Sequence, residues 1–125
     1  MKYLLIPAAL LISLTASAAG LPCSIHPKKG MADADLPALA AVTQSDAQNT
    51  ALKAVNVGSA TVSSGELEAE AGCLIYSFDI QIPGKKSIIE VAIDAGTGKV
   101  LAKKHEGPKA QAAEKVADAA AAKKK

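Results

Sequence analysis

Large aromatic side chains and arginine are almost absent from this sequence. Its 125 residues include one phenylalanine, two tyrosines, and no tryptophan or arginine. The apolar half of the chain therefore consists mostly of alanine, valine, isoleucine and leucine. A chain of this length and composition can bury the core of one small domain, but it is too small for a large enzyme core with several pockets.

Positive charge is not concentrated where a nucleic-acid partner needs it. Residues 43–107 contain six lysines and eight acids, whereas residues 108–125 contain five lysines and two acids. Nucleic-acid-binding domains normally carry their positive charge, together with arginine or aromatic residues, on the folded part. We therefore expect no nucleic-acid partner, and contact with a membrane only through the cationic C-terminal tail.

The start of the chain is typical of a secretory signal peptide. Lys2 provides a short positive region, residues 3–14 are apolar, and residues 16–18 supply the small side chains that signal peptidase recognises. We expect cleavage that removes residues 1–18 and export to the periplasm or the medium. An uncleaved membrane anchor is the alternative, because residues 3–25 carry no charge.

Two cysteines follow the signal peptide, Cys23 and Cys73. An even number of cysteines in a small exported domain favours a disulfide, and two cysteines allow only one pairing within the chain. We predict a Cys23–Cys73 bridge; two free thiols or a bridge between chains are the alternatives. Cys23 and His26 also have metal-ligand spacing, but a structural zinc site needs four ligands, and only His105 and distant acids remain. We therefore expect no metal and no cofactor.

Residues capable of catalysis are sparse. The two histidines are His26 and His105. His105 and Glu106 begin the zinc-protease pattern H-E-x-x-H, but Lys109 stands where the second histidine is needed, and Pro108 would break the helix. Neither an activated nucleophile nor a catalytic triad is evident. We expect no catalytic residues and a protein that is not an enzyme.

The hydrophobic pattern begins with a lead-in segment and a helix. Residues 19–42 are expected to be a flexible lead-in. Its first part, residues 19–35, shows no clear period and is expected to be extended, and tethered if Cys23 bonds to Cys73; its apolar end, residues 36–42, is either a helical turn or a packed strand-like segment. Residues 43–57 place apolar side chains at helical spacing. Thr43 is a good N-cap, and Gly58 is expected to end the helix.

After the predicted helix, the hydrophobic period changes to two. Residues 66–71, 73–82, 88–94 and 99–104 alternate between apolar and polar side chains and are separated by short turns. Short turns make neighbouring strands antiparallel, and the helix must cover the apolar face of the sheet. We therefore predict an α+β domain over residues 43–107, with one helix packed on a small antiparallel meander. Residues 108–125 form an Ala/Lys-rich tail that is expected to be disordered or a frayed helix.

Three acids, Glu66, Glu68 and Glu70, lie on one face of the first predicted strand. Paired carboxylates perform acid–base chemistry only where burial separates their pKa values. On a solvent-facing surface they favour solubility and protect a strand edge. We take this strand, together with His105 near the end of the last strand, as the candidate interaction surface.

Residues 94–98 are the most specific stretch of the sequence. The carboxylate of Asp94 can accept hydrogen bonds from backbone N–H groups around a turn, and Thr97 lies within the same turn. Gly98 supplies the positive φ that such a turn needs. The plain interpretation is a structural hairpin between two strands.

Three segments together resemble a PepSY domain. They are the helix start at Thr43 with Asp46, the Tyr76-centred strand at residues 76–80, and residues 91–101, in which an Asp-x-x-Thr-Gly turn leads into Val-Leu. The similarity covers about residues 43–106. PepSY domains are found in propeptides of thermolysin-type metallopeptidases and in many short exported bacterial proteins.

The resemblance implies a non-catalytic module that binds a peptidase outside the cytoplasm and inhibits or regulates it. Because no peptidase domain accompanies the module in this sequence, we expect it to act in trans. Two alternatives stay open. One is a scaffold that binds another envelope protein; the other is an exported protein that binds a metal or small ligand through His26, His105 and the acidic strand.

Overall fold

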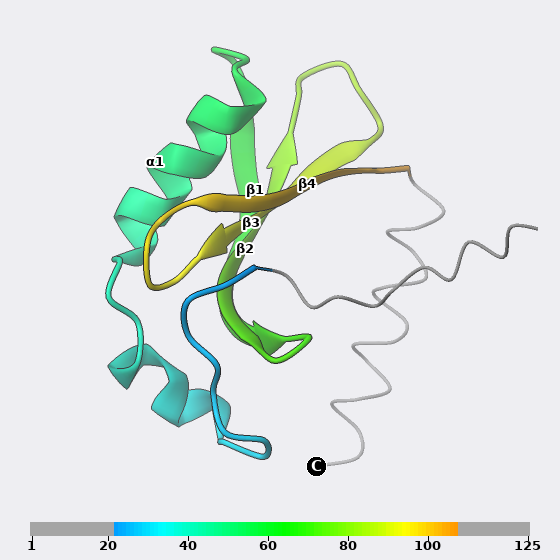
Figure 1. Ribbon diagram of the computed structural model, residues 1–125. Helices are drawn as coiled ribbons and strands as arrows, with labels where there is room; N and C mark the ends of the chain where they lie inside the picture. The colour runs from blue at the N-terminus through cyan, green and yellow to red at the C-terminus, as the bar shows by residue number, and fades with distance from the viewer. Residues whose placement is uncertain (1–21, 108–125) are drawn as a thin grey trace, which may run out of the picture.

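The computed structural model describes residues 22–107 (Figure 1). The predicted signal peptide, residues 1–18, and the predicted tail, residues 108–125, lie outside the described residues. The described elements are a 3₁₀ helix, one α-helix and four strands: η1 (Asp33–Ala38), α1 (Gln44–Val55), β1 (Thr61–Glu70), β2 (Cys73–Gln81), β3 (Ile88–Asp94) and β4 (Val100–Glu106).

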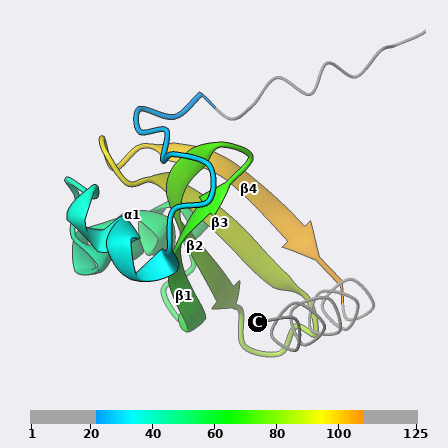
Figure 2. The ribbon, with the colours of Figure 1, turned by 90° about the horizontal axis from the view of Figure 1, so that it is seen from below.

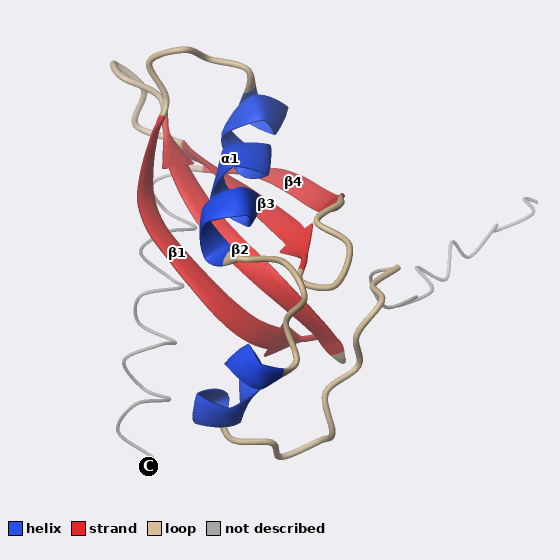
Figure 3. Cartoon of the chain, turned by 90° about the vertical axis from the view of Figure 1, so that its left-hand side faces the viewer, coloured by secondary structure: helices blue, strands red, loops and turns tan. Residues whose placement is uncertain are grey.

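The four strands form one antiparallel meander in the order β1-β2-β3-β4, and α1 lies across one face of it (Figure 3). This arrangement confirms the predicted α+β fold. The β1–β2 hairpin turns through two residues, Ala71 and Gly72, which have φ values of 50° and 80°. Two consecutive positive φ values match the right-handed twist of the flanking strands. Within the described residues, no helix is both long and apolar enough to span a membrane.

Local sequence signals account for α1, with one correction. The Thr43 hydroxyl accepts a hydrogen bond from the Asp46 N–H at 3.1 Å, which is the expected N-cap contact. Gly58, however, does not end the helix. Asn56 takes the left-handed conformation, with φ 56°, and donates its N–H to the Leu52 carbonyl. Asparagine tolerates this conformation better than most residues, so the helix ends before glycine is reached.

The core lies between α1 and the sheet. Its fully buried side chains come from one helix face and from alternate positions of β2 and β3, joined by Leu36 of η1; they include Ala47, Ala51, Leu74, Phe78, Ile80, Val91 and Ile93. Tyr76 and Phe78 stack with ring centroids 6.2 Å apart. The Tyr76 hydroxyl donates to the Val42 carbonyl at 2.7 Å, so the ring also fixes the chain entering α1.

Strand β1 starts five residues earlier than the alternation of charged residues indicates. It begins at Thr61 and carries an irregularity between Val62 and Ser64, where the register with β2 shifts. Beyond this point, Gly65 lies directly over Phe78; a Cβ at this position would lie 2.8 Å from two ring carbons. Glycine therefore allows the strand to pass the largest side chain of the core.

The described part of the lead-in packs against the domain and is not loose. Leu36 is 1% exposed, and the turn of 3₁₀ helix around it settles the open assignment of this apolar segment. Both Ala41 and Val42 donate their backbone N–H groups to the Ala95 carbonyl at 3.0 Å. Figure 2 shows the lead-in, in blue, passing over the end of the sheet where β2 begins. These contacts join residues that are far apart in the sequence, so no local sequence pattern predicts them.

Candidate functional site

A disulfide joins the lead-in to the sheet. It links Cys23 to Cys73, the first residue of β2, with the two Cα atoms 5.8 Å apart. The predicted pairing is therefore confirmed. Disulfides form and persist in oxidising environments, so the bridge indicates a protein that works outside the cytoplasm.

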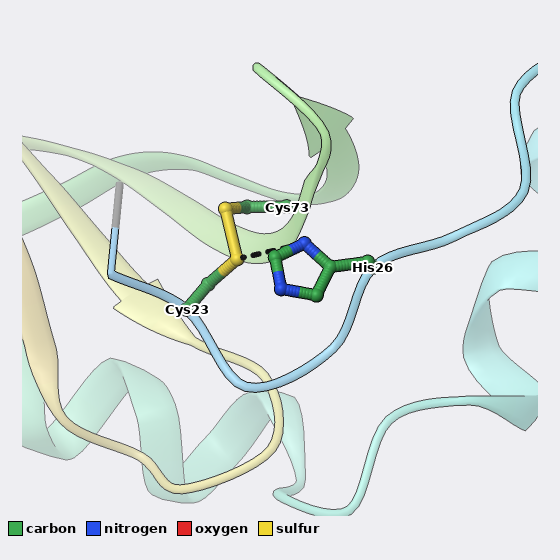
Figure 4. Close-up of side chains that lie close together, drawn as sticks. All are labelled: Cys23, His26 and Cys73. Carbon is green, nitrogen blue, oxygen red and sulfur yellow. Dashed lines mark hydrogen bonds between the residues drawn. A yellow bond between two sulfur atoms is a disulfide. The ribbon is translucent and has the colours of Figure 1, made fainter. Parts of the chain in front are cut away.

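His26 lies beside this disulfide (Figure 4). Its Nδ1 is 3.0 Å from the Gly72 carbonyl oxygen and 3.7 Å from Cys23 Sγ. One nitrogen of the ring and the two cysteine sulfurs all lie within 4.8 Å of one another. The spacing of Cys23 and His26 suggested this proximity, but Cys73, 50 residues away from Cys23 in sequence, joins the cluster only through the fold.

The Asp94 turn is a buried junction between β3 and the lead-in. The Asp94 side chain is 2% exposed, and its Oδ1 accepts from the N–H groups of Gly96 and Ser24, both at 3.3 Å. Its Oδ2 accepts from the Thr97 hydroxyl at 2.6 Å. Gly98 has φ 76°, as the turn requires. The predicted turn residues thus act together structurally, and Ser24 is a partner that the sequence did not reveal.

The hydrogen bonds decide the charge state of Asp94. Burial by itself would raise the pKa of this carboxyl, but the bonds from Thr97, Ser24 and Gly96 outweigh burial and lower the pKa below its ordinary value. The hydrogen bonds of the turn therefore stabilise the ionised carboxylate of Asp94. As a carboxylate, Asp94 accepts the Ser24 N–H and so holds the lead-in against the turn.

The three acids of β1 lie on the sheet face away from α1. Glu66, Glu68 and Glu70 stand opposite Ser77, Ile75 and Cys73 of β2. Glu66 and Glu70 are exposed and Glu68 is half-buried. His105 lies on β4 opposite Ile89, at the other edge of the sheet, so the structure does not bring it to the acids.

A groove runs beside β1. It has a volume of about 540 Å³ and is lined by Asp33 of η1 and by Glu66, Leu67, Glu68 and Ala69. A second hollow of about 400 Å³ adjoins the end of the strand. One side of it is lined by Ala69 and Gly72, and the other by residues 27–31 of the lead-in. The β1 edge is therefore flanked by concave surface along its acidic half.

The direction of the backbone groups at this edge follows from the neighbouring strand. The Leu74 N–H donates to the Ile25 carbonyl at 2.9 Å, and the Leu74 carbonyl accepts from the Ala95 N–H at 3.2 Å. Both backbone groups of Leu74 thus point away from β1. Leu74 is paired with Ala69, so in this antiparallel ladder Ala69 also directs its N–H and C=O away from its partner, out of the sheet edge.

The alternation of the ladder extends this result along β1. Leu67 and Gly65 stand two and four residues before Ala69, so their backbone groups point the same way. In agreement, the Gly65 carbonyl accepts a hydrogen bond from Gln44 Nε2 at 3.4 Å, outside the β1–β2 ladder. Leu67 and Ala69, which both line the groove, therefore direct their main-chain groups away from β2 and out of the sheet edge. The outward direction of these main-chain groups follows only from the strand register and the hydrogen bonds. The sequence therefore predicted the strand, but not that Leu67 and Ala69 present their backbone at its edge.

Comparison with known proteins identifies the family. The model of the "Peptidase propeptide and YPEB domain", PepSY, matches residues 41–104, which is just over half of the chain and spans α1 to β4. No curated protein and no solved structure gives a significant match. PepSY domains are generally non-catalytic modules, and the residues matched here include the Asp94 turn and the whole of the β1 edge. The chain belongs to the PepSY family.

Proposed function

We propose that this chain is a non-catalytic binding module that attaches to a separate peptidase outside the cytoplasm and slows it. The proposal is supported by the family, whose description names peptidase propeptides. The observation that carries it is the β1 edge, where Leu67 and Ala69 direct backbone donors and acceptors out of the sheet, beside a groove that both residues line. An extended segment of a partner can add to such an edge as a further strand.

The side chains around the groove define the partner's chemistry. Asp33, Glu66 and Glu68 line it with carboxylates, while Leu67 and Ala69 contribute apolar surface. An extended segment with lysine or arginine at alternate positions and small apolar residues between them matches this pattern. The partner surface that we propose is therefore a basic loop or strand at the rim of the peptidase cleft.

Export by a cleaved signal peptide completes the proposal. The disulfide is consistent with an oxidising compartment. Within that setting we place the chain in the periplasm or the medium, where exported peptidases work. Intact mass of the protein recovered from these fractions tests the leader, since the chain is expected to lack residues 1–18.

A proline scan of the edge tests binding. Ala69 is exposed, and its N–H points out of the sheet, so Ala69→Pro removes one outward donor without touching the β1–β2 ladder. Ala69→Val is the matched control, because it retains the N–H and suits a strand. Both variants and the parent chain are titrated against secreted metallopeptidases of the same organism, with binding and inhibition measured separately.

We expect the parent chain and Ala69→Val to bind and inhibit, and Ala69→Pro to bind at least about tenfold more weakly, corresponding to about 1.4 kcal/mol. A Glu66/Glu68→Gln double variant is expected to lose affinity mainly at low salt. Equal binding by the proline and valine variants would place the interface elsewhere on the domain. Binding to none of the peptidases at micromolar concentration would overturn the proposed function.

A further inference from the structure

We propose that Cys23, His26 and Cys73 form a zinc site when their disulfide is reduced. The three side chains already converge at one point, with their ligand atoms within 4.8 Å of one another (Figure 4). Two thiolates and one imidazole are ligands that zinc prefers, and three protein ligands leave a fourth position for water. This inference concerns the end of the sheet near the lead-in and does not depend on the peptidase proposal.

The backbone holds the ligands close without help from the disulfide. Ile25 lies between the two lead-in ligands, and its carbonyl accepts from the Leu74 N–H, next to Cys73. Ser24 donates its N–H to the buried carboxylate of Asp94. Both residues between Cys23 and His26 are thus tied to the sheet by hydrogen bonds that do not involve the sulfurs. The separation of 5.8 Å between the Cys23 and Cys73 Cα atoms lets both sulfurs reach one ion by side-chain rotation.

The contacts of His26 suit a metal ligand. In the tautomer with a proton on Nδ1, this nitrogen donates to the Gly72 carbonyl at 3.0 Å and leaves Nε2 with its lone pair. Nδ1 is also the nitrogen that lies 3.7 Å from Cys23 Sγ, so the ring must turn for Nε2 to bind the ion. A backbone carbonyl that accepts from the second nitrogen commonly orients ligating histidines. His26 is exposed, so the open fourth position faces solvent.

The chemistry requires a reductant, because a disulfide offers no thiolate. An external dithiol supplies two electrons: its two thiols become a disulfide, and Cys23 and Cys73 become thiols. Zinc then displaces one proton from each thiol, binds both sulfurs, and takes the lone pair of the His26 imidazole. Binding of the ion therefore releases two protons and protects both sulfurs from reoxidation.

The test compares oxidised and reduced full-length chain, with the phosphine reductant removed before metal is added under anaerobic conditions. Zinc binding is measured by competition with a chromophoric chelator, and cobalt(II) is used as a spectroscopic probe of thiolate ligation. We expect one zinc per reduced chain, a thiolate-to-cobalt charge-transfer band, and neither signal for the oxidised chain. His26→Ala removes a direct ligand and is expected to weaken zinc binding by more than the roughly 10- to 100-fold that loss of an outer-shell partner costs, while His105→Ala, the matched control at the other exposed histidine, leaves it unchanged.

The test remains decisive whether or not the reduced chain stays folded. If the reduced chain stays folded by circular dichroism, the affinities are compared directly. If it unfolds, zinc is expected to restore the native spectrum of the parent chain but not that of His26→Ala. Absence of zinc binding by the reduced chain, or binding that His26→Ala and Cys73→Ser leave unchanged, overturns the site.

Discussion

Removing the Asp94 carboxylate is the most direct test of how the lead-in is held. At neutral pH, Asp94→Ala leaves the N–H groups of Ser24 and Gly96 and the Thr97 hydroxyl without their acceptor at a position that is 2% exposed. Hydrogen bonds to a charged acceptor contribute about 1.5–3 kcal/mol each, and the two at 3.3 Å belong at or below the weak end. The short bond from Thr97 then contributes about 1.5–3 kcal/mol and the two longer bonds up to about 1.5 kcal/mol each, so we expect the free energy of unfolding to fall by roughly 2–6 kcal/mol.

The pH dependence separates the role of the charge from that of packing. Because the folded state lowers the pKa of Asp94, its contribution is fully present above the unfolded pKa of about 3.9 and is lost as the pH falls through the folded value. The stability difference between the parent chain and Asp94→Asn is expected to shrink as the pH falls below about 4. Urea unfolding followed by circular dichroism at pH 7 and at acidic pH measures both effects. A loss below about 1 kcal/mol for Asp94→Ala at pH 7, or a difference that stays constant with pH, would refute this account of the junction.

Three further changes test the packing of the domain by thermal and urea unfolding. Phe78→Ala removes a ring that is 0% exposed and is expected to cost about 3–5 kcal/mol; a cost near 1 kcal/mol would contradict its central position. Gly65→Ala puts a methyl group 2.8 Å from that ring and is expected to cost about 1–3 kcal/mol, so an unchanged melting temperature would show that the strand can move aside. Ala71→Asn suits the positive φ of 50° in the β1–β2 turn and is expected to stabilise by up to about 1 kcal/mol, whereas Ala71→Val should destabilise.

Features of the fold that depend on neighbours in sequence were predictable. Thr43 and Asp46 form the expected N-cap, and the period of two from Cys73 to Ile82 separates the core face of β2 from the opposite face. The predicted end of α1 at Gly58 was wrong. Two residues that readily adopt positive φ, Asn56 and Gly58, lie close together, and the helix ends at the first of them. The sequence alone does not show at which of these two residues the helix ends.

Features that depend on distant partners were not predictable. Ser24 and Asp94 are 70 residues apart, and the sequence around one of them does not predict a contact with the other. The approach of His26 to Cys73 depends on the backbone bond between Ile25 and Leu74. The outward direction of the Ala69 backbone likewise depends on which residues of β2 bond to β3. Physical rules predict these features only after the strand register is known.

The length of the usable β1 edge limits how a partner can bind. At one end, the Gly65 carbonyl already accepts from Gln44, and at the other the Gly72 carbonyl accepts from His26. Between them, Leu67 and Ala69 each offer one donor and one acceptor, so an added strand gains at most about four main-chain hydrogen bonds, or about 4 kcal/mol at roughly 1 kcal/mol each. That gain only matches the lowest estimates, about 4 kcal/mol, of what association costs in lost rotational and translational freedom. Main-chain bonds alone are therefore too few to hold an added strand, and in the function that we propose the side chains at the groove supply the rest of the affinity, with its acids selecting the partner.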